Sequence, residues 1–168
     1  MWATHSYATR TGSTIGVAAA SGETLGGRGF AVDVKPLKEN PPTDGYAAVL
    51  IGSAVNGAKW LPEAVEWVQN NQQALNRAPV ALFSVHIMNL GDDEGSRKNR
   101  LAYLNAVRPL LKPLEEAFFA GLGMEPARAS LLERLAYQLF KVGPEGDCRD
   151  WPKIRAWAET LAPRLALL

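Results

Sequence analysis

The chain has 168 residues, of which 47% are hydrophobic and 21% are charged, and its formal net charge is +1. This size and composition are typical of one globular domain with a full core, so we expect residues 1–168 to form a single domain. The near-neutral charge excludes a strongly basic nucleic-acid binder, and the single cysteine excludes an internal disulfide framework. We see neither a membrane-spanning apolar run nor a signal-peptide pattern, so a cytoplasmic protein is expected.

The predicted elements alternate between strand and helix. The first strand, at about residues 3–8, is polar, whereas a buried central strand is usually rich in Val, Ile and Leu. We interpret His5 in that strand as structural, because no partner with metal-ligand spacing stands near it. The other elements that we expect, in chain order, are a helix over 13–26 stopped by Gly26-Gly27, a strand over 29–34, a strand over 46–53, a helix over 61–75, a strand over 80–85, a helix over 96–111 after a charged loop at 91–99, a strand over 116–122 and helices over 128–141 and 151–162.

This alternation predicts an α/β fold with a doubly wound, five-stranded parallel sheet and helices on both faces. In such sheets, ligands bind beyond the carboxyl ends of the strands, where the strand order reverses. Three segments leave those ends with small or hydroxyl side chains, at residues 9–14, 53–59 and 84–91. We therefore predict that these three segments together form a ligand site.

The segment from Thr9 to Thr14 points most clearly to a ligand. Hydroxyl side chains surround Gly12, and an apolar, helix-compatible run follows directly. A loop that opens a helix offers unpaired backbone N–H groups, hydroxyl donors and the positive end of the helix dipole, which suit a phosphate. The alternative is an ordinary helix N-cap, since Ser and Thr are favoured there in any case.

The same residues carry a resemblance to a known family. Thr9-Arg10-Thr11-Gly12-Ser13-Thr14 resembles the phosphate-binding loop of the flavodoxin family, commonly written Thr/Ser-x-Thr-Gly-x-Thr. The segment from Gly52 to Trp60 is similar to the flavin-ring loop of the branch that includes the menaquinone-dependent protoporphyrinogen oxidases. Phe83-Ser84-Val85-His86 and Asp150-Trp151 resemble that branch as well.

The resemblance implies FMN as the cofactor and a flavodoxin-like sheet of order 2-1-3-4-5. The residues that it implies for cofactor binding are Thr9, Arg10, Thr11, Gly12, Ser13, Thr14, Ser53, Ala54, Val55, Asn56, Gly57, Lys59, Trp60, Ser84, Val85, His86, Asn89 and Gly91. Three roles stay open at this stage. Trp60 stacks on the flavin or packs in the core, Arg10 pairs with the phosphate or points to solvent, and His86 shuttles protons or only packs.

We predict no catalytic side chain and no metal site. Flavin chemistry requires no protein nucleophile, and the sequence has no HExxH, GxSxG or GxGxxG motif. The charge run Asp92-Asp93-Glu94 is interpreted as a solvated loop and not as a metal site.

Three functions fit these observations. The first is an FMN oxidoreductase resembling protoporphyrinogen oxidase, which passes electrons between an organic, porphyrin-type substrate and a quinone. The second is an electron carrier with a protein partner, and the third is a cofactor-free domain of the same fold. Carrier flavodoxins are characteristically acidic, whereas 17 acidic residues face 18 basic ones here, and this balance favours the oxidoreductase.

A last expectation concerns residues 128–142, whose leucines recur at helical spacing with Arg and Lys at their flanks. Such a helix either packs on the sheet or contacts a membrane or quinone peripherally, at the inner membrane face.

Overall fold

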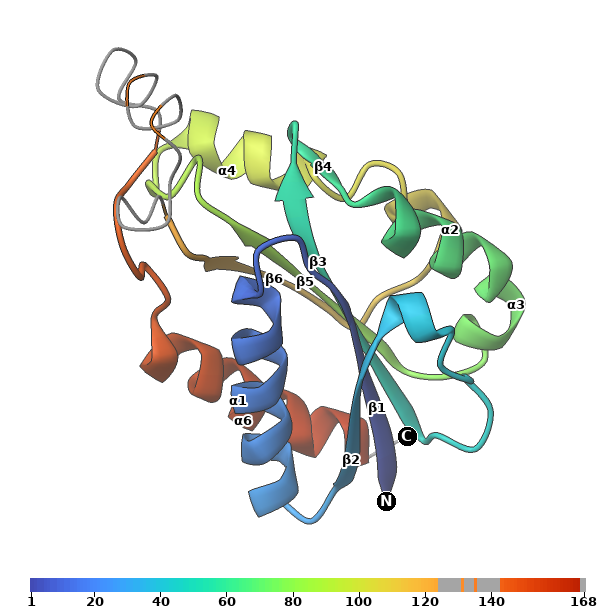
Figure 1. Ribbon diagram of the computed structural model, residues 1–168. Coiled ribbons are helices and arrows are strands. Elements are labelled where there is room, and N and C mark those ends of the chain that lie inside the picture. The colour runs from blue at the N-terminus through green and yellow to red at the C-terminus, as the bar shows by residue number, and fades with distance from the viewer. Residues whose placement is uncertain (124–130, 132–134, 136–142, 167–168) are drawn as a thin grey trace.

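The computed structural model describes residues 1–123, 131, 135 and 143–166, and it contains a parallel sheet between two layers of helices (Figure 1). The elements, in chain order, are β1 (Trp2–Ala8), α1 (Ser13–Gly27), β2 (Ala31–Pro36), the short 3₁₀ helix η1 (Leu37–Glu39), β3 (Ala48–Asn56), β4 (Lys59–Trp60), α2 (Pro62–Asn70), α3 (Gln72–Leu75), β5 (Val80–His86), α4 (Glu94–Ala102), η2 (Arg108–Leu110), β6 (Glu115–Ala120) and α6 (Trp151–Ala166).

The strand order is β2-β1-β3-β5-β6, and these five strands are parallel. This confirms the predicted doubly wound sheet and its order. One addition was not predicted, because the short strand β4 pairs antiparallel with the end of β3. Helices α1 and α6 cover one face, whereas α2, α3 and η1 cover the other (Figure 1).

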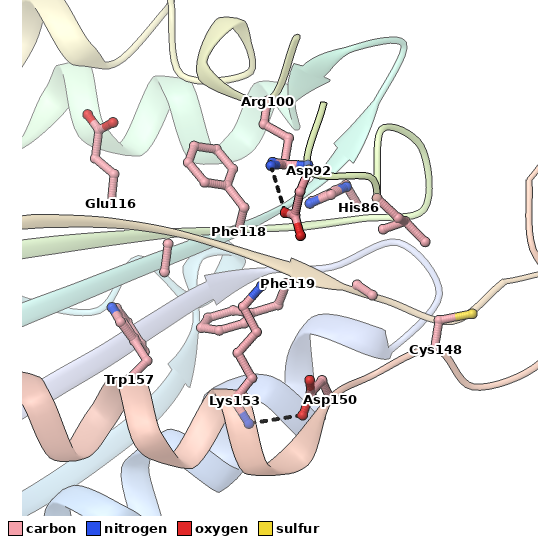
Figure 2. A pocket seen from close by; sticks show the side chains of 13 residues that line it. His86, Asp92, Arg100, Glu116, Phe118, Phe119, Cys148, Asp150, Lys153 and Trp157 are labelled. Carbon is pink, nitrogen blue, oxygen red and sulfur yellow. Dashed lines mark hydrogen bonds and ion pairs between the residues drawn. The ribbon is translucent and has the colours of Figure 1, made fainter. Parts of the chain in front are cut away.

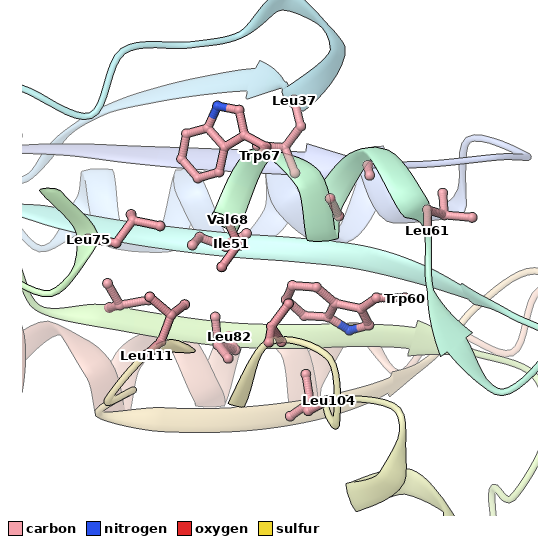
Figure 3. Packing of buried hydrophobic residues seen from close by; sticks show 14 of the residues in the cluster. Leu37, Ile51, Trp60, Leu61, Trp67, Val68, Leu75, Leu82, Leu104 and Leu111 are labelled. Carbon is pink, nitrogen blue, oxygen red and sulfur yellow. The ribbon is translucent and has the colours of Figure 1, made fainter. Parts of the chain in front are cut away.

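The larger core cluster lies between the sheet and α2 (Figure 3). Ile51 of β3 and Leu82 of β5 reach into it from the sheet, and Trp67 and Val68 reach into it from α2. Strands β3 and β5 are buried on both faces, as their apolar sequences require in a parallel sheet. Their burial holds the carboxyl ends of the central strands in fixed positions.

The polar strand β1 is fully part of the core. The hydroxyls of Thr4 and Ser6 lie 3.2 Å apart and bond to each other on one face. On the other face the His5 ring meets the Phe83 ring edge-on, with their centroids 5.0 Å apart. Burial lowers the pKa of His5 from 6.5 to about 3, so this side chain is neutral at neutral pH. This supports the interpretation of His5 as a structural residue.

Several element boundaries differ from the predicted ones. Helix α1 runs through Gly26-Gly27 and ends before Gly29, whose φ of +90° is the left-handed conformation that ends helices. The predicted helix over 61–75 is divided at Asn71 into α2 and α3. The predicted helix over 96–111 begins earlier and ends at Ala102, because the chain then turns to bury Tyr103, Leu104 and Val107 against the sheet.

The predicted helix over 128–141 lies outside the described residues except for Leu131 and Leu135. Both leucines are exposed, at 86% and 56% of their surface. Among the helices that the structure describes, none combines the length and the hydrophobicity that crossing a bilayer requires.

Candidate functional site

The loop between β1 and α1 lies at the carboxyl edge of the sheet. Its Gly12 precedes the first turn of α1 with a φ of +89°, in the left-handed region that glycine adopts without strain. The Thr9 hydroxyl accepts a hydrogen bond from the Gly12 N–H over 3.0 Å, which closes the loop on itself. The predicted loop therefore has the tight backbone that a helix N-terminal anion site requires.

The first turn of α1 has polar groups left over for a ligand. The hydroxyl of Thr14 is fully buried and has no hydrogen-bond partner among the described residues. Burying a hydroxyl without a partner is costly, and a ligand that supplied an acceptor to this hydroxyl would offset the cost. No side chain caps the helix and its first turn has no acidic residue, so the positive end of its dipole is not neutralised.

The other residues of this loop differ in exposure. Ser13 is buried, and its hydroxyl lies against Gly121 just beyond the end of β6. Thr11 and Arg10 are exposed. Solvent exposure of Arg10 agrees with the second of its two predicted alternatives, and its pairing with a phosphate stays a prediction.

The second predicted segment is mostly strand and hairpin, and not a loop. Ser53 and Ala54 lie inside β3, which continues through Val55 to Asn56 and turns back at Gly57 and Ala58 into β4. Both turn residues have positive φ, of 57° and 59°, as a tight hairpin turn requires. Gly57 at the first turn position is a hairpin signal that was available in the sequence, whereas Ala58 at the second position is not.

The hydroxyl of Ser53 is used inside the protein. It accepts a hydrogen bond from the Leu61 N–H over 3.0 Å and donates to the Ala54 carbonyl over 2.8 Å. It therefore anchors the start of α2. The exposed members of this segment are Asn56, Gly57, Ala58 and Lys59.

Trp60 packs in the core and does not offer its ring to a ligand (Figure 3). Only 3% of it is exposed, and its indole N–H donates to the Ser84 hydroxyl over 2.8 Å. Of the two alternatives for Trp60, the structure therefore supports packing. Ser84, which belongs to the third predicted segment, is buried and accepts that hydrogen bond.

The third segment is held by contacts within itself and with α4. His86 is buried, its Nδ1 lies 2.6 Å from the Met88 carbonyl, and its ring packs against Tyr103. Burial lowers the pKa of His86, which keeps the ring neutral at neutral pH. The Asn89 side-chain amide donates to the Tyr103 hydroxyl over 2.6 Å. Val85 is buried and Gly91 is exposed.

The charge run at residues 92–94 is a helix start. The Asp93 carboxylate accepts hydrogen bonds from the N–H and the hydroxyl of Ser96, over 2.8 and 2.6 Å, and so caps α4. Within the described ranges, no three His, Cys, Asp or Glu side chains gather as a metal site would need.

The fold defines a class: a doubly wound parallel α/β protein with a glycine-containing strand-to-helix loop at its switch point. Comparison with known families names it more narrowly. Residues 6–144 match the flavodoxin domain, and the chain belongs to the flavodoxin family. No curated protein matches the sequence significantly.

Solved structures agree with the family in fold. A flavodoxin from the domain Archaea has 13% identity and a TM-score of 0.63, with 99% of each chain covered. Flavodoxin 1 from Bacillus cereus has 12% identity and a TM-score of 0.56, with 97% of this chain and 98% of that chain covered. Rubredoxin oxygen:oxidoreductase from Desulfovibrio gigas has 14% identity and a TM-score of 0.59, with 99% of this chain covered but 36% of that one. These matches do not support the protoporphyrinogen oxidase branch.

FMN is the cofactor of the flavodoxin family, and the residues present here fit it. The buried Thr14 hydroxyl lacks a partner among the described residues, and the first turn of α1 carries no opposing carboxylate. A phosphate would supply the missing acceptor and would meet the positive end of the helix.

Proposed function

We propose that this protein is an FMN-binding electron carrier that exchanges electrons with a protein partner. The observation that carries the proposal is the first turn of α1, which has no acidic residue and contains the Thr14 hydroxyl without a partner among the described residues, in a chain of the flavodoxin family. The likeness to complete flavodoxins over 99% of both chains supports a carrier that acts as one domain.

The residues of the site would bind and orient the cofactor. The N–H groups of the first turn of α1 and the Thr14 hydroxyl would hold the phosphate. The β3–β4 turn and the loop after β5 would flank the ring through their backbones, since Ser53, Ser84 and Trp60 already bond within the protein. When bound, FMN supplies the electron chemistry, and the surrounding amides tune its potential.

The side chains at this edge favour a carrier over a substrate oxidase. An oxidase that acts on an organic substrate needs polar groups free to position it. The predicted candidates Ser53, Ser84, His86 and Asn89 instead hold their own loops together. The near-neutral charge that favoured the oxidase is a weaker argument, because it describes the whole surface and not the site.

Two assays test the proposal. Isothermal titration of the folded apoprotein should show one FMN bound per chain, and absence of FMN binding would refute the cofactor. Anaerobic reduction of the loaded protein by a ferredoxin-type reductase should then proceed. If the protein instead oxidises protoporphyrinogen with a menaquinone analogue and is not reduced by the reductase, the carrier hypothesis is wrong and the oxidase hypothesis takes its place.

The variant Thr14→Val should separate binding from folding. We expect FMN affinity to fall about tenfold to a hundredfold, because a hydrogen bond to a charged group contributes about 1.5–3 kcal/mol. The apoprotein should be as stable as the wild type or more stable, because the change removes a buried hydroxyl that has no partner among the described residues. Titration and urea unfolding measure the two effects. Unchanged FMN affinity would exclude Thr14 from the phosphate site.

Peripheral membrane contact through residues 128–142 is a second proposal, supported by the exposure of Leu131 and Leu135. In flotation with anionic liposomes, the wild type should float and the Leu135→Asp variant should not. Leu101→Asp is the matched control, since Leu101 is an exposed leucine of α4. If the wild-type protein does not float with the liposomes, the proposal of membrane contact is wrong.

A further inference from the structure

The two edges of the sheet differ in how they are protected. Edge strands usually carry charges or proline, which discourage pairing with another chain. The outer strand β2 follows this pattern with Asp33, Lys35 and Pro36. The other outer strand, β6, begins with Glu115 and Glu116, which pair with Arg164 and Arg108, and continues as Ala-Phe-Phe-Ala over residues 117–120. Residues 117–120 are therefore the part of this edge that carries no charge or proline against pairing.

A groove runs along this edge. A cavity of about 510 Å³ is lined by residues 116–120 of β6 itself. Arg100 and Asp92 form the wall on one side of the strand, and Lys153 and Trp157 form the wall on the other side (Figure 2). The strand order ends at β6, so no strand of the described chain pairs with its outer side.

We propose that the β6 groove binds an extended, acidic segment of a protein partner, which adds to the sheet as a further strand. Main-chain hydrogen bonds to the β6 edge would provide affinity, and the side chains of the two walls would provide selectivity.

The walls favour a single extended segment over a second copy of this chain. The strand edge lies on the floor of the groove, between side chains that come from α4 and α6 and their loops. A second copy would bring the same walls beside its own edge. A single extended strand has no such walls.

The charges favour a carboxylate on the incoming segment. Of the acidic groups in the groove, Glu116 is held by Arg108 through two hydrogen bonds of 2.9 and 2.6 Å, and Asp150 caps α6 by accepting from the Lys153 N–H over 3.0 Å. The Lys153 ammonium has no ion-pair partner in the part of the chain that the structure describes.

The second cation of the groove, Arg100, is already used inside the protein. Its guanidinium donates to the Asn89 and Gly91 carbonyls over 2.6 and 2.5 Å, and only 14% of its side chain is exposed. Lys153 is therefore the cation that the groove offers to an acidic partner.

The groove reaches the loop that we expect to flank the flavin, because Leu90 and His86 line its end. A partner held there would lie beside the cofactor. That role in electron transfer rests on the proposed function, whereas binding of the segment does not.

The probe is a fluorescein-labelled octapeptide of alternating valine and glutamate. Two further octapeptides serve as comparisons, one with lysine in place of glutamate and one with N-methyl groups on alternate residues. Fluorescence anisotropy measures binding to the apoprotein and to the FMN-loaded protein. Amide hydrogen exchange by NMR reports on residues 116–120. We expect the glutamate peptide to bind both forms and to slow exchange within residues 116–120, and we expect the N-methylated peptide not to bind.

The variant Lys153→Glu should weaken binding of the glutamate peptide about fivefold, as expected for an exposed ion pair. Arg155→Glu is the matched control, because Arg155 is on the same helix but lines the cleft with α1, and it should bind as the wild type does. Three results would overturn the proposal: no peptide binding at millimolar concentration, equal binding of the N-methylated peptide, or protection, in the free protein, of those amides of residues 116–120 that do not bond to β5. Absence of FMN binding would not by itself contradict the proposal that the β6 groove binds the peptide.

Discussion

Acidification should unfold this protein through His5 before its carboxylates titrate. The buried His5 has a pKa of about 3 in the folded chain, against 6.5 when it is exposed. Between about pH 3 and pH 6.5, His5 binds a proton in the unfolded chain but not in the folded chain. The free energy of unfolding therefore falls as the pH falls. The stability that neutral His5 preserves is fully present above pH 6.5, and it decreases by about 1.4 kcal/mol for each pH unit below that value.

The folded structure has no way to accept that proton. The Nε2 atom of His5 has no hydrogen-bond partner among the described residues, and its Nδ1 atom lies 3.5 Å from the Ser21 hydroxyl. Because that hydroxyl donates to the Val17 carbonyl over 2.7 Å, it can only accept from the ring. A charged imidazolium would therefore have a second N–H without an acceptor.

Urea unfolding between about pH 7.5 and pH 4.5 measures the effect, and the wild type should lose roughly 3 kcal/mol over this range. The variant His5→Leu should remove most of that slope. His86→Gln is the comparison, since the chain has two histidines. Burial lowers the pKa of His86 as well, so this variant should lose part of the slope and keep the larger part, which comes from His5. The prediction is wrong if His5→Leu is as sensitive to pH as the wild type.

The sheet could be predicted because its signals are local. Strands β3 and β5 are continuous apolar runs, and each is followed by a segment with helical character, so the alternation alone indicated a parallel sheet. The polar strand β1 was harder to recognise. Its hydroxyls bond to each other and its histidine packs on Phe83, and these contacts depend on the finished sheet.

The predicted loop between β1 and α1 is present, whereas several of the other predicted site side chains bond within the protein. The phosphate loop was recognisable because its hydroxyls, its glycine and the helix after it lie within a few residues. The Trp60–Ser84 hydrogen bond joins residues 24 positions apart and requires the register of three strands. The β6 groove depends on how α6 returns to the sheet, and no local pattern in the sequence specifies that.

The variant Gly52→Ala should destabilise the protein by about 3 kcal/mol, at the upper end for overpacked cores. Gly52 of β3 stands directly opposite Phe83 of β5 in the parallel register. The Phe83 ring lies over the Gly52 backbone, and a Cβ atom added there would be 1.8 Å from Cζ of the ring. His5, Phe119 and Trp157 surround the same ring, so it has no space into which to move.

Urea unfolding at neutral pH measures this loss, with Gly26→Ala as the control. An added Cβ at Gly26 meets nothing within 4 Å, and alanine in a helix is favoured over glycine, so this control should gain up to about 1 kcal/mol. The double variant Gly52→Ala/Phe83→Leu tests the mechanism, because a smaller side chain makes room for the new methyl group. Its loss should be smaller than the sum of the two single losses by about 1 kcal/mol or more. Strictly additive losses would show that the Phe83 ring is not what makes glycine necessary at position 52.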